Sequence, residues 1–294
     1  MAQNKDDIFA TANKFFDAEN YAAAYKQVNL AVKSDPENEK FLMFKGMTQV
    51  KLKMYQAAFE TYSSIIEKYP DNSHALLNRG NLFYSSQDFE SALADFNKGM
   101  SLAKSDSEKI SFHLNLGAVK SSTRNFQGAY DNYMSAYALD SMNIGILNNL
   151  ATVCDEVGKG ELTLGYLEKI IRIDPTFVGA YGNIGFKYQE MGNYARAITY
   201  FDKVLEMNKN EPLGYSNRAF NKYKLGDHKG ALNDINKSID LFPANSYAFR
   251  IRALIYLAQN KNSEACKDLD KAHILGFTEM YGGEVDTLIS EFCK

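Results

Sequence analysis

Tryptophan is absent from the 294 residues, and cysteine, histidine and proline are scarce, at three, four and five residues. Three cysteines are too few for a scaffold built on disulfides. Five prolines leave room for many helices, because a proline interrupts a helix whose interior it enters. The four histidines are far apart, and none has a metal-ligand spacing from a cysteine or another histidine, so we expect no metal site.

The chain also lacks a strong excess of charge of either sign. Its 33 Lys and Arg residues nearly balance 36 Asp and Glu residues, for a formal net charge of −3. Proteins that bind nucleic acids or anionic membranes usually carry a strong basic excess, so we expect no nucleic-acid partner. No stretch approaches the roughly 20 apolar residues that span a bilayer, so we expect no membrane insertion.

The sequence leaves the compartment open. Residues 1–8 are polar and charged and do not resemble a signal peptide. As written, the chain would be cytoplasmic. However, Ala2 and Gln3 would also suit a mature N-terminus after removal of a leader, and the periplasm or cell envelope would then be expected.

Motifs for catalysis are missing as well. Gly158-Lys159-Gly160 lacks the preceding strand and the Gly-Lys-Ser/Thr ending of a phosphate loop. No nucleophile elbow or triad-like motif occurs. We therefore expect no catalytic residues, no cofactor and no enzymatic activity.

What the chain does have is an internal repeat of 34 residues. Pro36 and Pro70 are one period apart, and Pro175 and Pro243 are two periods apart. Such a period is typical of solenoid proteins. A three-residue insertion at 107–109 precedes the fourth unit. The eight predicted units are 5–38, 39–72, 73–106, 110–143, 144–177, 178–211, 212–245 and 246–279.

Three columns recur at fixed positions in these units. The first column is always Gly or Ala: Ala12, Gly46, Gly80, Gly117, Ala151, Gly185, Ala219 and Ala253. The second is small in every unit: Ala24, Ala58, Ala92, Ala129, Thr163, Ala197, Ala231 and Ala265. The third is bulky and apolar: Val28, Tyr62, Phe96, Tyr133, Leu167, Phe201, Ile235 and Leu269. Small residues let helix axes approach and bulky ones fill the space beside them, so the columns predict paired helices.

Turn residues separate the two halves of each unit. They are Asn20, Gln87-Asp88, Asn125, Gly192-Asn193 and Gly226-Asp227. Each unit is therefore predicted to be a helix–turn–helix hairpin, and hairpins must stack because one cannot bury its apolar face alone. Ser105 and Glu108 form a predicted capping box before a lengthened first helix in the fourth unit.

This pattern resembles the tetratricopeptide repeat family over residues 5–279, in the style of its stand-alone bacterial members. The resemblance implies an all-α fold, a right-handed superhelical solenoid of eight repeats whose first helices line a concave groove. It also implies a non-enzymatic function in binding other proteins. Residues 280–294 are not a ninth repeat. We expect a turn at Tyr281-Gly282-Gly283 and an amphipathic helix over 284–292 that caps the solenoid.

One asparagine column is a candidate peptide-binding site. A carboxamide can pair with both the N–H and the C=O of a peptide, so stacked amides would bind an extended backbone. This arrangement resembles the asparagine ladder of tetratricopeptide superhelices. The alternative is that the amides only bond to neighbouring helices. The column consists of Asn78, Asn115, Asn149, Asn183 and Asn217.

Glycines and aromatic residues at groove-facing positions extend this candidate site. Interior helical glycine costs about 0.8–1 kcal/mol relative to alanine, so its presence favours an open groove floor, unless packing simply tolerates it. Aromatic residues suit recognition, although each of them taken alone fits the core between repeats better. The residues are Gly145, Gly179, Gly182, Phe186, Phe220 and Tyr223.

Two hypotheses of function follow. The first is a module that binds an extended peptide or partner segment in its concave groove. The second is a structural subunit that assembles a complex through its convex face or its ends. Binding of a C-terminal carboxylate, as in chaperone-docking relatives, is not expected because the required cations are missing beside the asparagines. The partner and the oligomeric state are not specified by the sequence.

The three cysteines divide into two groups. Cys154 lies at a helical position that is usually buried, and we expect a packed thiol. Cys266 and Cys293 lie in the last repeat and the tail, and could form a disulfide if the tail folds back.

Overall fold

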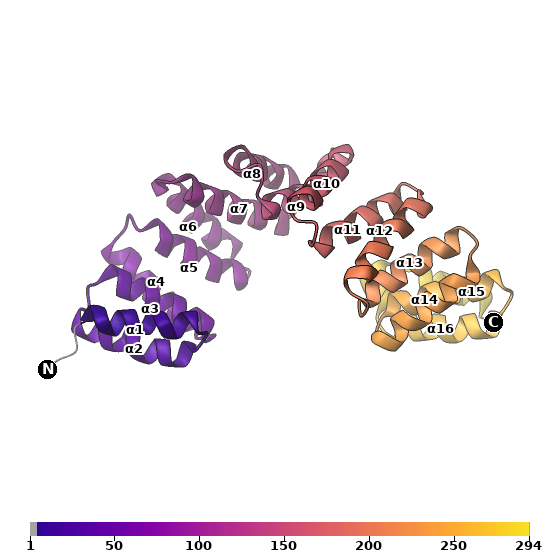
Figure 1. Ribbon diagram of the computed structural model, residues 1–294, viewed down its shortest axis with the longest axis horizontal. Helices are drawn as coiled ribbons and strands as arrows, with labels where there is room; N and C mark the ends of the chain where they lie inside the picture. Colours follow the sequence, from indigo (N-terminus) through magenta and orange to yellow (C-terminus); the bar gives the residue numbers. More distant parts are fainter. Residues whose placement is uncertain (1–4, 294) are drawn as a thin grey trace. The chain divides into compact units, whose positions relative to one another are not determined.

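A computed structural model describes residues 5–293, and within this range the chain folds into helices joined by short turns (Figure 1). It divides into two compact units, Met1–Gly158 and Lys159–Lys294. The predicted all-α solenoid is thereby confirmed in its class.

The N-terminal unit consists of helix pairs that pack as hairpins, α1 with α2, α3 with α4, α5 with α6, and α7 with α8. A ninth helix packs on α8, and a 3₁₀ turn over Asp155–Val157 follows it. The helices are α1 (Lys5–Asp17), α2 (Tyr21–Ser34), α3 (Glu39–Lys51), α4 (Tyr55–Lys68), α5 (Ser73–Ser85), α6 (Phe89–Leu102), α7 (Asp106–Ser122), α8 (Phe126–Leu139) and α9 (Ile144–Val153).

The C-terminal unit is built in the same way, with the pairs α11 and α12, α13 and α14, and α15 and α16. A 3₁₀ turn over Gly160–Leu162 precedes its first helix, and the last helix, α18, packs against α16. The helices are α10 (Thr163–Ile173), α11 (Val178–Glu190), α12 (Tyr194–Met207), α13 (Pro212–Lys224), α14 (His228–Leu241), α15 (Ser246–Ala258), α16 (Asn262–Ile274), α17 (Phe277–Tyr281) and α18 (Glu284–Phe292).

Side-chain caps explain where most second helices begin. An Asn or Asp oxygen accepts a hydrogen bond from the backbone N–H three residues later, which satisfies a donor that the helix itself leaves open. These caps confirm the predicted turn residues. The capping residues are Asn20, Asp88, Asn125, Asn193 and Asp227.

The capping box at the start of α7 is confirmed. The Ser105 hydroxyl accepts from the backbone N–H of Glu108, and the Glu108 carboxylate accepts from the backbone N–H of Ser105. The same carboxylate accepts from the Ser73 hydroxyl of α5 at 2.7 Å and from the N–H of Lys104. These hydrogen bonds, that from Ser73 first, lower the pKa of Glu108 from 4.5 to about 2.

This lowered pKa predicts an acid-dependent stability. A carboxylate whose folded pKa lies below its unfolded pKa stabilises the protein fully above the unfolded value, and that contribution disappears as the pH falls toward the folded value. Glu108 should therefore contribute above pH 4.5 and progressively less down to about pH 2. In Glu108→Gln, urea midpoints measured at pH 7 and pH 3 should differ less than in the unchanged chain. An unaltered difference would contradict this role.

The two columns of small and bulky residues meet as predicted. Gly46 lies against Tyr62, Gly80 against Phe96, Gly117 against Tyr133 and Gly185 against Phe201. A Cβ atom added at these glycines would lie between 2.3 and 3.0 Å from the opposing ring. Only glycine permits this approach of the two helices of a hairpin, because real Cβ atoms do not come so close.

A repeated ion pair that the sequence reasoning missed links the same helices. Three arginines donate two hydrogen bonds each to a nearly buried aspartate 16 residues later: Arg79 to Asp95, Arg218 to Asp234, and Arg252 to Asp268. The third guanidinium nitrogen, Nη1, reaches back to the preceding hairpin: Ser63 at 3.3 Å, Asp202 at 2.7 Å and Asn236 at 2.8 Å. Each arginine thus joins three successive helices.

Two regions differ from the expected repeat. Between α9 and α10 two 3₁₀ turns stand in place of continuous helix, with Gly158 at a φ of 70°, and the boundary between the units lies directly after this glycine. After α16, Gly276 at a φ of 77° ends the helix, and a short helix α17 follows over the end of the predicted eighth unit and the first residue of the predicted turn. Positive φ favours glycine, which explains both interruptions. Helix α18 covers the residues of the predicted tail helix.

Candidate functional site

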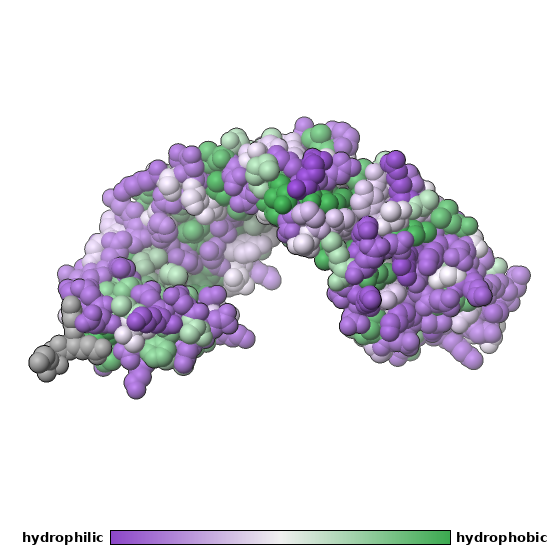
Figure 2. Space-filling model, viewed as in Figure 1, coloured by the Kyte–Doolittle hydropathy of each residue, from purple (hydrophilic) through white to green (hydrophobic). Residues whose placement is uncertain are grey.

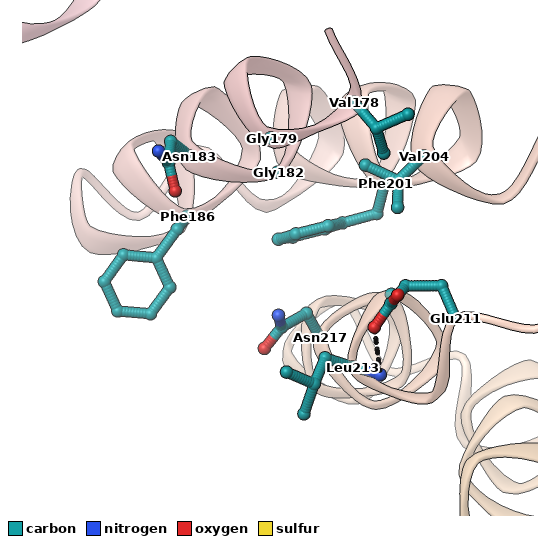
Figure 3. A pocket seen from close by; sticks show the side chains of 11 residues that line it. Val178, Gly179, Gly182, Asn183, Phe186, Phe201, Val204, Glu211, Leu213 and Asn217 are labelled. Carbon is teal, nitrogen blue, oxygen red and sulfur yellow. Dashed lines mark hydrogen bonds between the residues drawn. The ribbon is translucent and has the colours of Figure 1, made fainter. Parts of the chain in front are cut away.

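A cavity of about 410 Å³ lies between α11 and α13 in the C-terminal unit. Figure 3 shows Phe186 extending from α11 and Leu213 and Asn217 from α13 toward this space, with the ring of Phe201 between the two helices. The residues around the cavity are Val178, Gly179, Gly182, Asn183, Phe186, Phe201, Val204, Glu211, Leu213, Gly214 and Asn217.

Glycines keep the α11 side of this cavity open. A Cβ atom at Gly182 would meet only the Val204 Cγ2 atom at 3.9 Å, an ordinary contact, and would project into the cavity. At Gly179 a Cβ would lie 3.3 Å from the Phe177 ring. Gly182 is therefore not required by packing, in contrast to Gly185 one turn later, which faces Phe201 at 3.0 Å.

A second cavity of about 470 Å³ continues from the first. The two share Phe186, Leu213 and Asn217, so we treat them together as the α11–α18 groove. The second cavity reaches α15, α17 and α18 and is lined by Phe186, Gln189, Leu213, Asn217, Phe220, Tyr247, Arg250, Phe277, Tyr281 and Glu284.

Several of the exposed side chains of the groove are large and apolar or aromatic. Phe186, Leu213 and Tyr281 are 47%, 51% and 59% exposed. Figure 2 shows that hydrophilic residues dominate the visible face of the C-terminal unit. Large apolar side chains gathered at one cavity of a hydrophilic protein mark an interaction site more often than isolated ones do.

The charged groups of the groove are already engaged. The Glu211 carboxylate accepts from the N–H of Leu213 at 3.3 Å and caps α13. The Arg250 guanidinium, whose side chain is 13% exposed, donates to Glu284 at 2.5 Å. It also lies 5.6 Å from the Phe220 ring centre and 6.0 Å from that of Tyr247, while its buried Nε has no partner among the described residues. Burial raises the pKa of the Tyr247 phenol.

Six of the candidate site residues lie in this groove. They are Gly179, Gly182, Asn183, Phe186, Asn217 and Phe220. Tyr223 lies elsewhere, since it is half-buried, packs on the core of Ala219 and Ala231, and has its ring 5.8 Å from that of His228. The remaining candidates occupy α5, α7 and α9 of the N-terminal unit: Asn78, Asn115, Asn149 and Gly145.

The asparagine column divides according to its hydrogen bonds. The amide nitrogens of Asn78 and Asn115 donate to carbonyls of their own helices, His74 at 2.9 Å and Ser111 at 2.8 Å. Within residues 5–293, the side-chain amides of Asn149, Asn183 and Asn217 make no hydrogen bond. The Asn183 and Asn217 amides of the groove therefore keep both donors and the acceptor available.

A neighbouring amide has a structural role instead. Asn221 is buried and donates to the Gln189 side chain and to the Asn217 carbonyl, at 2.7 and 2.8 Å. This pair ties α13 to α11 beneath the groove.

Several groove residues escaped the sequence reasoning although the repeat contained a signal for two of them. Adding 34 residues to Gly179 gives Leu213, and adding 34 more gives Tyr247, both of which line the groove. Phe277, Tyr281 and Glu284 lie outside the repeats, so no period could find them.

Residues 5–293 contain no group of three or more His, Cys, Asp or Glu side chains arranged to hold a metal ion. None of the helices in that range combines the length and hydrophobicity needed to cross a membrane. In the same range Cys266 and Cys293 are joined by a disulfide, and Cys154 is a buried cysteine outside it.

Family models of the tetratricopeptide repeat match residues 9–73, 55–101 and 178–211. No curated protein sequence matches the chain significantly.

Several solved structures have a similar fold. The C-terminal part of a TPR repeat-containing protein from Cytophaga hutchinsonii has a TM-score of 0.63 at 20% identity, over 80% of this chain and 96% of that one. Pseudomonas aeruginosa pilF has a TM-score of 0.60 at 21% identity, over 75% and 96%. YrrB, described as a TPR protein with an unusual peptide-binding site, has a TM-score of 0.52 at 22% identity, over 64% and 95%. At these identities the likeness concerns the fold.

Proposed function

Because the chain belongs to the tetratricopeptide repeat family, we propose that it binds an extended peptide segment of a partner protein in the α11–α18 groove. Members of this family generally mediate protein–protein interactions without catalysis. The observation that carries the proposal is the pair of unbonded amides, Asn183 and Asn217, beside an apolar cavity on successive first helices. YrrB shows by its description that this fold supports peptide binding.

The amides favour recognition of a peptide backbone. Each carboxamide offers two donors and an acceptor, which matches the N–H and C=O groups that an extended peptide leaves open. Backbone recognition of this kind depends little on sequence, so it supplies affinity but not selectivity. The equivalent amides Asn78 and Asn115 each have a donor engaged within their own helix and are less suited to this role.

Selectivity would come from the apolar cavity. Its walls are formed by Phe186, Phe201, Val204 and Leu213, and the absent side chain of Gly182 leaves room at its floor. The charged groups nearby, Glu211 and the Arg250–Glu284 pair, already have partners. A bulky uncharged side chain of the ligand would therefore be favoured over an anionic one, which would lose water without gaining a counter-charge because Arg250 is already paired with Glu284.

Filling the cavity floor should weaken binding. Peptides are first selected against the full chain from a random-sequence phage library. We expect Gly182→Leu to lower the affinity of the chain for these peptides at least about tenfold, since a loss of about 1.4 kcal/mol of binding free energy suffices for that factor. Gly165→Leu is the matched control. It places the same side chain on a neighbouring helix, at a glycine whose added Cβ meets nothing within 4 Å, and should leave the affinity unchanged.

The measurement is fluorescence anisotropy of the labelled peptides, together with circular dichroism of both variants. Equal affinities for Gly182→Leu and the unchanged chain would contradict groove binding. Failure to select any peptide, combined with an oligomeric mass by light scattering, would favour the alternative function as an assembly subunit that acts through its convex face or ends.

A further inference from the structure

The end of the α11–α18 groove is formed by a segment that a disulfide holds in place. Phe277 and Tyr281 of α17 and Glu284 of α18 line the groove, and the bond between Cys266 and Cys293 encloses the whole segment in a covalent loop. We propose that the thiol state of these two cysteines controls the groove. This inference rests on the proposed function, because it assigns a regulation to that same site.

The disulfide fixes both ends of this loop to one support. Cys266 lies on α16, inside the repeats, and Cys293 lies directly after α18, with a sequence separation of 27 residues. Of the residues between them and outside α16, Phe277, Tyr281 and Glu284 line the groove. Opening the bond therefore leaves the last part of the wall attached to the solenoid only through the chain at Gly276 and through packing.

The packing that remains is limited. Helix α18 has nine residues, well below the length at which an isolated helix is stable in water. Val285 is its one buried residue, and Leu288 and Ile289 pack beside it against α16. Two polar contacts to the repeats add to this, Asp286 with His273 and Glu284 with Arg250, and the Thr278 hydroxyl of α17 donates to Asp286. A short helix held by so few contacts belongs to the part of a fold that opens locally.

Opening would change the chemistry of the groove as well as its shape. Glu284 is the only carboxylate that pairs with the Arg250 guanidinium in the described chain, and the Nε of Arg250 is buried without a partner. Loss of Glu284 would leave this cation unpaired beside the aromatic rings of Phe220 and Tyr247. Departure of Tyr281 would also uncover the ring of Tyr247, which now lies 5.9 Å away.

The chemical step is thiol–disulfide exchange with a dithiol. One thiolate of the dithiol attacks a sulfur of the Cys266–Cys293 bond, the other thiol resolves the mixed disulfide, and two protons pass to the released cysteines. The dithiol is oxidised by two electrons and the protein is reduced by two. The third cysteine, Cys154, is buried and does not take part. Oxidising compartments would keep the wall closed and reducing ones would release it.

Hydrogen exchange of the full chain, followed by mass spectrometry, tests this switch without a ligand. We expect amides of residues 284–292 to exchange at least about tenfold faster in chain reduced with dithiothreitol than in oxidised chain, while α13 is unaffected. Cys266→Ser with Cys293→Ser should match the reduced chain and show no response to the reductant. The same exchange rate in α18 before and after reduction would overturn the proposal. It would also be overturned if the chain, unfolded without any reductant, showed three titratable thiols, because the disulfide leaves only the thiol of Cys154.

A binding measurement separates this inference from the proposed function. Library peptides that bind the oxidised chain should change affinity by at least about threefold on reduction, whereas affinities unchanged within error would overturn control of the groove. If α18 responds to reduction but no peptide binds either form, the switch of the wall is supported and the proposed function is contradicted.

Discussion

Replacing Arg252 with methionine is expected to lower the free energy of unfolding of the C-terminal unit by about 3 kcal/mol. Its partner Asp268 has a side chain only 8% exposed, and the substitution leaves that carboxylate without its cation and without two hydrogen bonds. Removing one member of a buried ion pair typically costs about 3–5 kcal/mol, and the lower figure applies because Arg252 itself is 21% exposed. Urea unfolding followed by circular dichroism measures the loss.

The double variant Arg252→Met with Asp268→Leu distinguishes the ion pair from the packing of the arginine stem. Replacing both partners with apolar residues removes the unpaired charge, and such replacements are often neutral. We expect the double variant to recover most of the lost stability. A double variant as unstable as the single one would show that the carboxylate is not the cause.

Gly117→Ala should also destabilise the protein, by about 1–3 kcal/mol, although alanine is the better helix former. The added Cβ would lie 2.3 Å from the Tyr133 Cε1 atom, so α7 and α8 must separate or the ring must leave its position. Thermal unfolding of the N-terminal unit reports the change.

Gly165→Ala is a control for which we expect the opposite change in stability. Its Cβ meets nothing within 4 Å on α10, so the substitution should stabilise the chain by up to about 1 kcal/mol. Tyr133→Leu combined with Gly117→Ala should restore part of the lost stability by removing the ring that collides. A Gly117→Ala chain more stable than the original would refute the close approach.

The columns of the repeat predicted the contacts that depend on side-chain size. Gly46, Gly80, Gly117 and Gly185 face the bulky residues of the third column, because a period of 34 residues returns each pair to the same place in its hairpin. The caps at Asn20 and Asp88 were equally predictable, since their chemistry is local.

Contacts that need a particular geometry were not predictable in this way. The three Arg–Asp pairs have a constant separation of 16 residues, but arginine is missing from that position in most units, so no column stood out. Composition alone could not show that Asn183 keeps a free amide whereas Asn78 donates to its own helix. The wall at Tyr281 follows from the positive φ of Gly276, a local interruption without any periodic signal.

The arginine links also determine how the C-terminal unit should come apart. Arg218 connects α12, α13 and α14, and Arg252 connects α14, α15 and α16, so the two links share α14. In a one-dimensional array, stronger coupling between neighbours favours melting as a single block over fraying from one end. The five helices α12–α16 should consequently lose their structure in one transition, whereas α1–α3, which precede the link at Arg79, are free to unravel earlier.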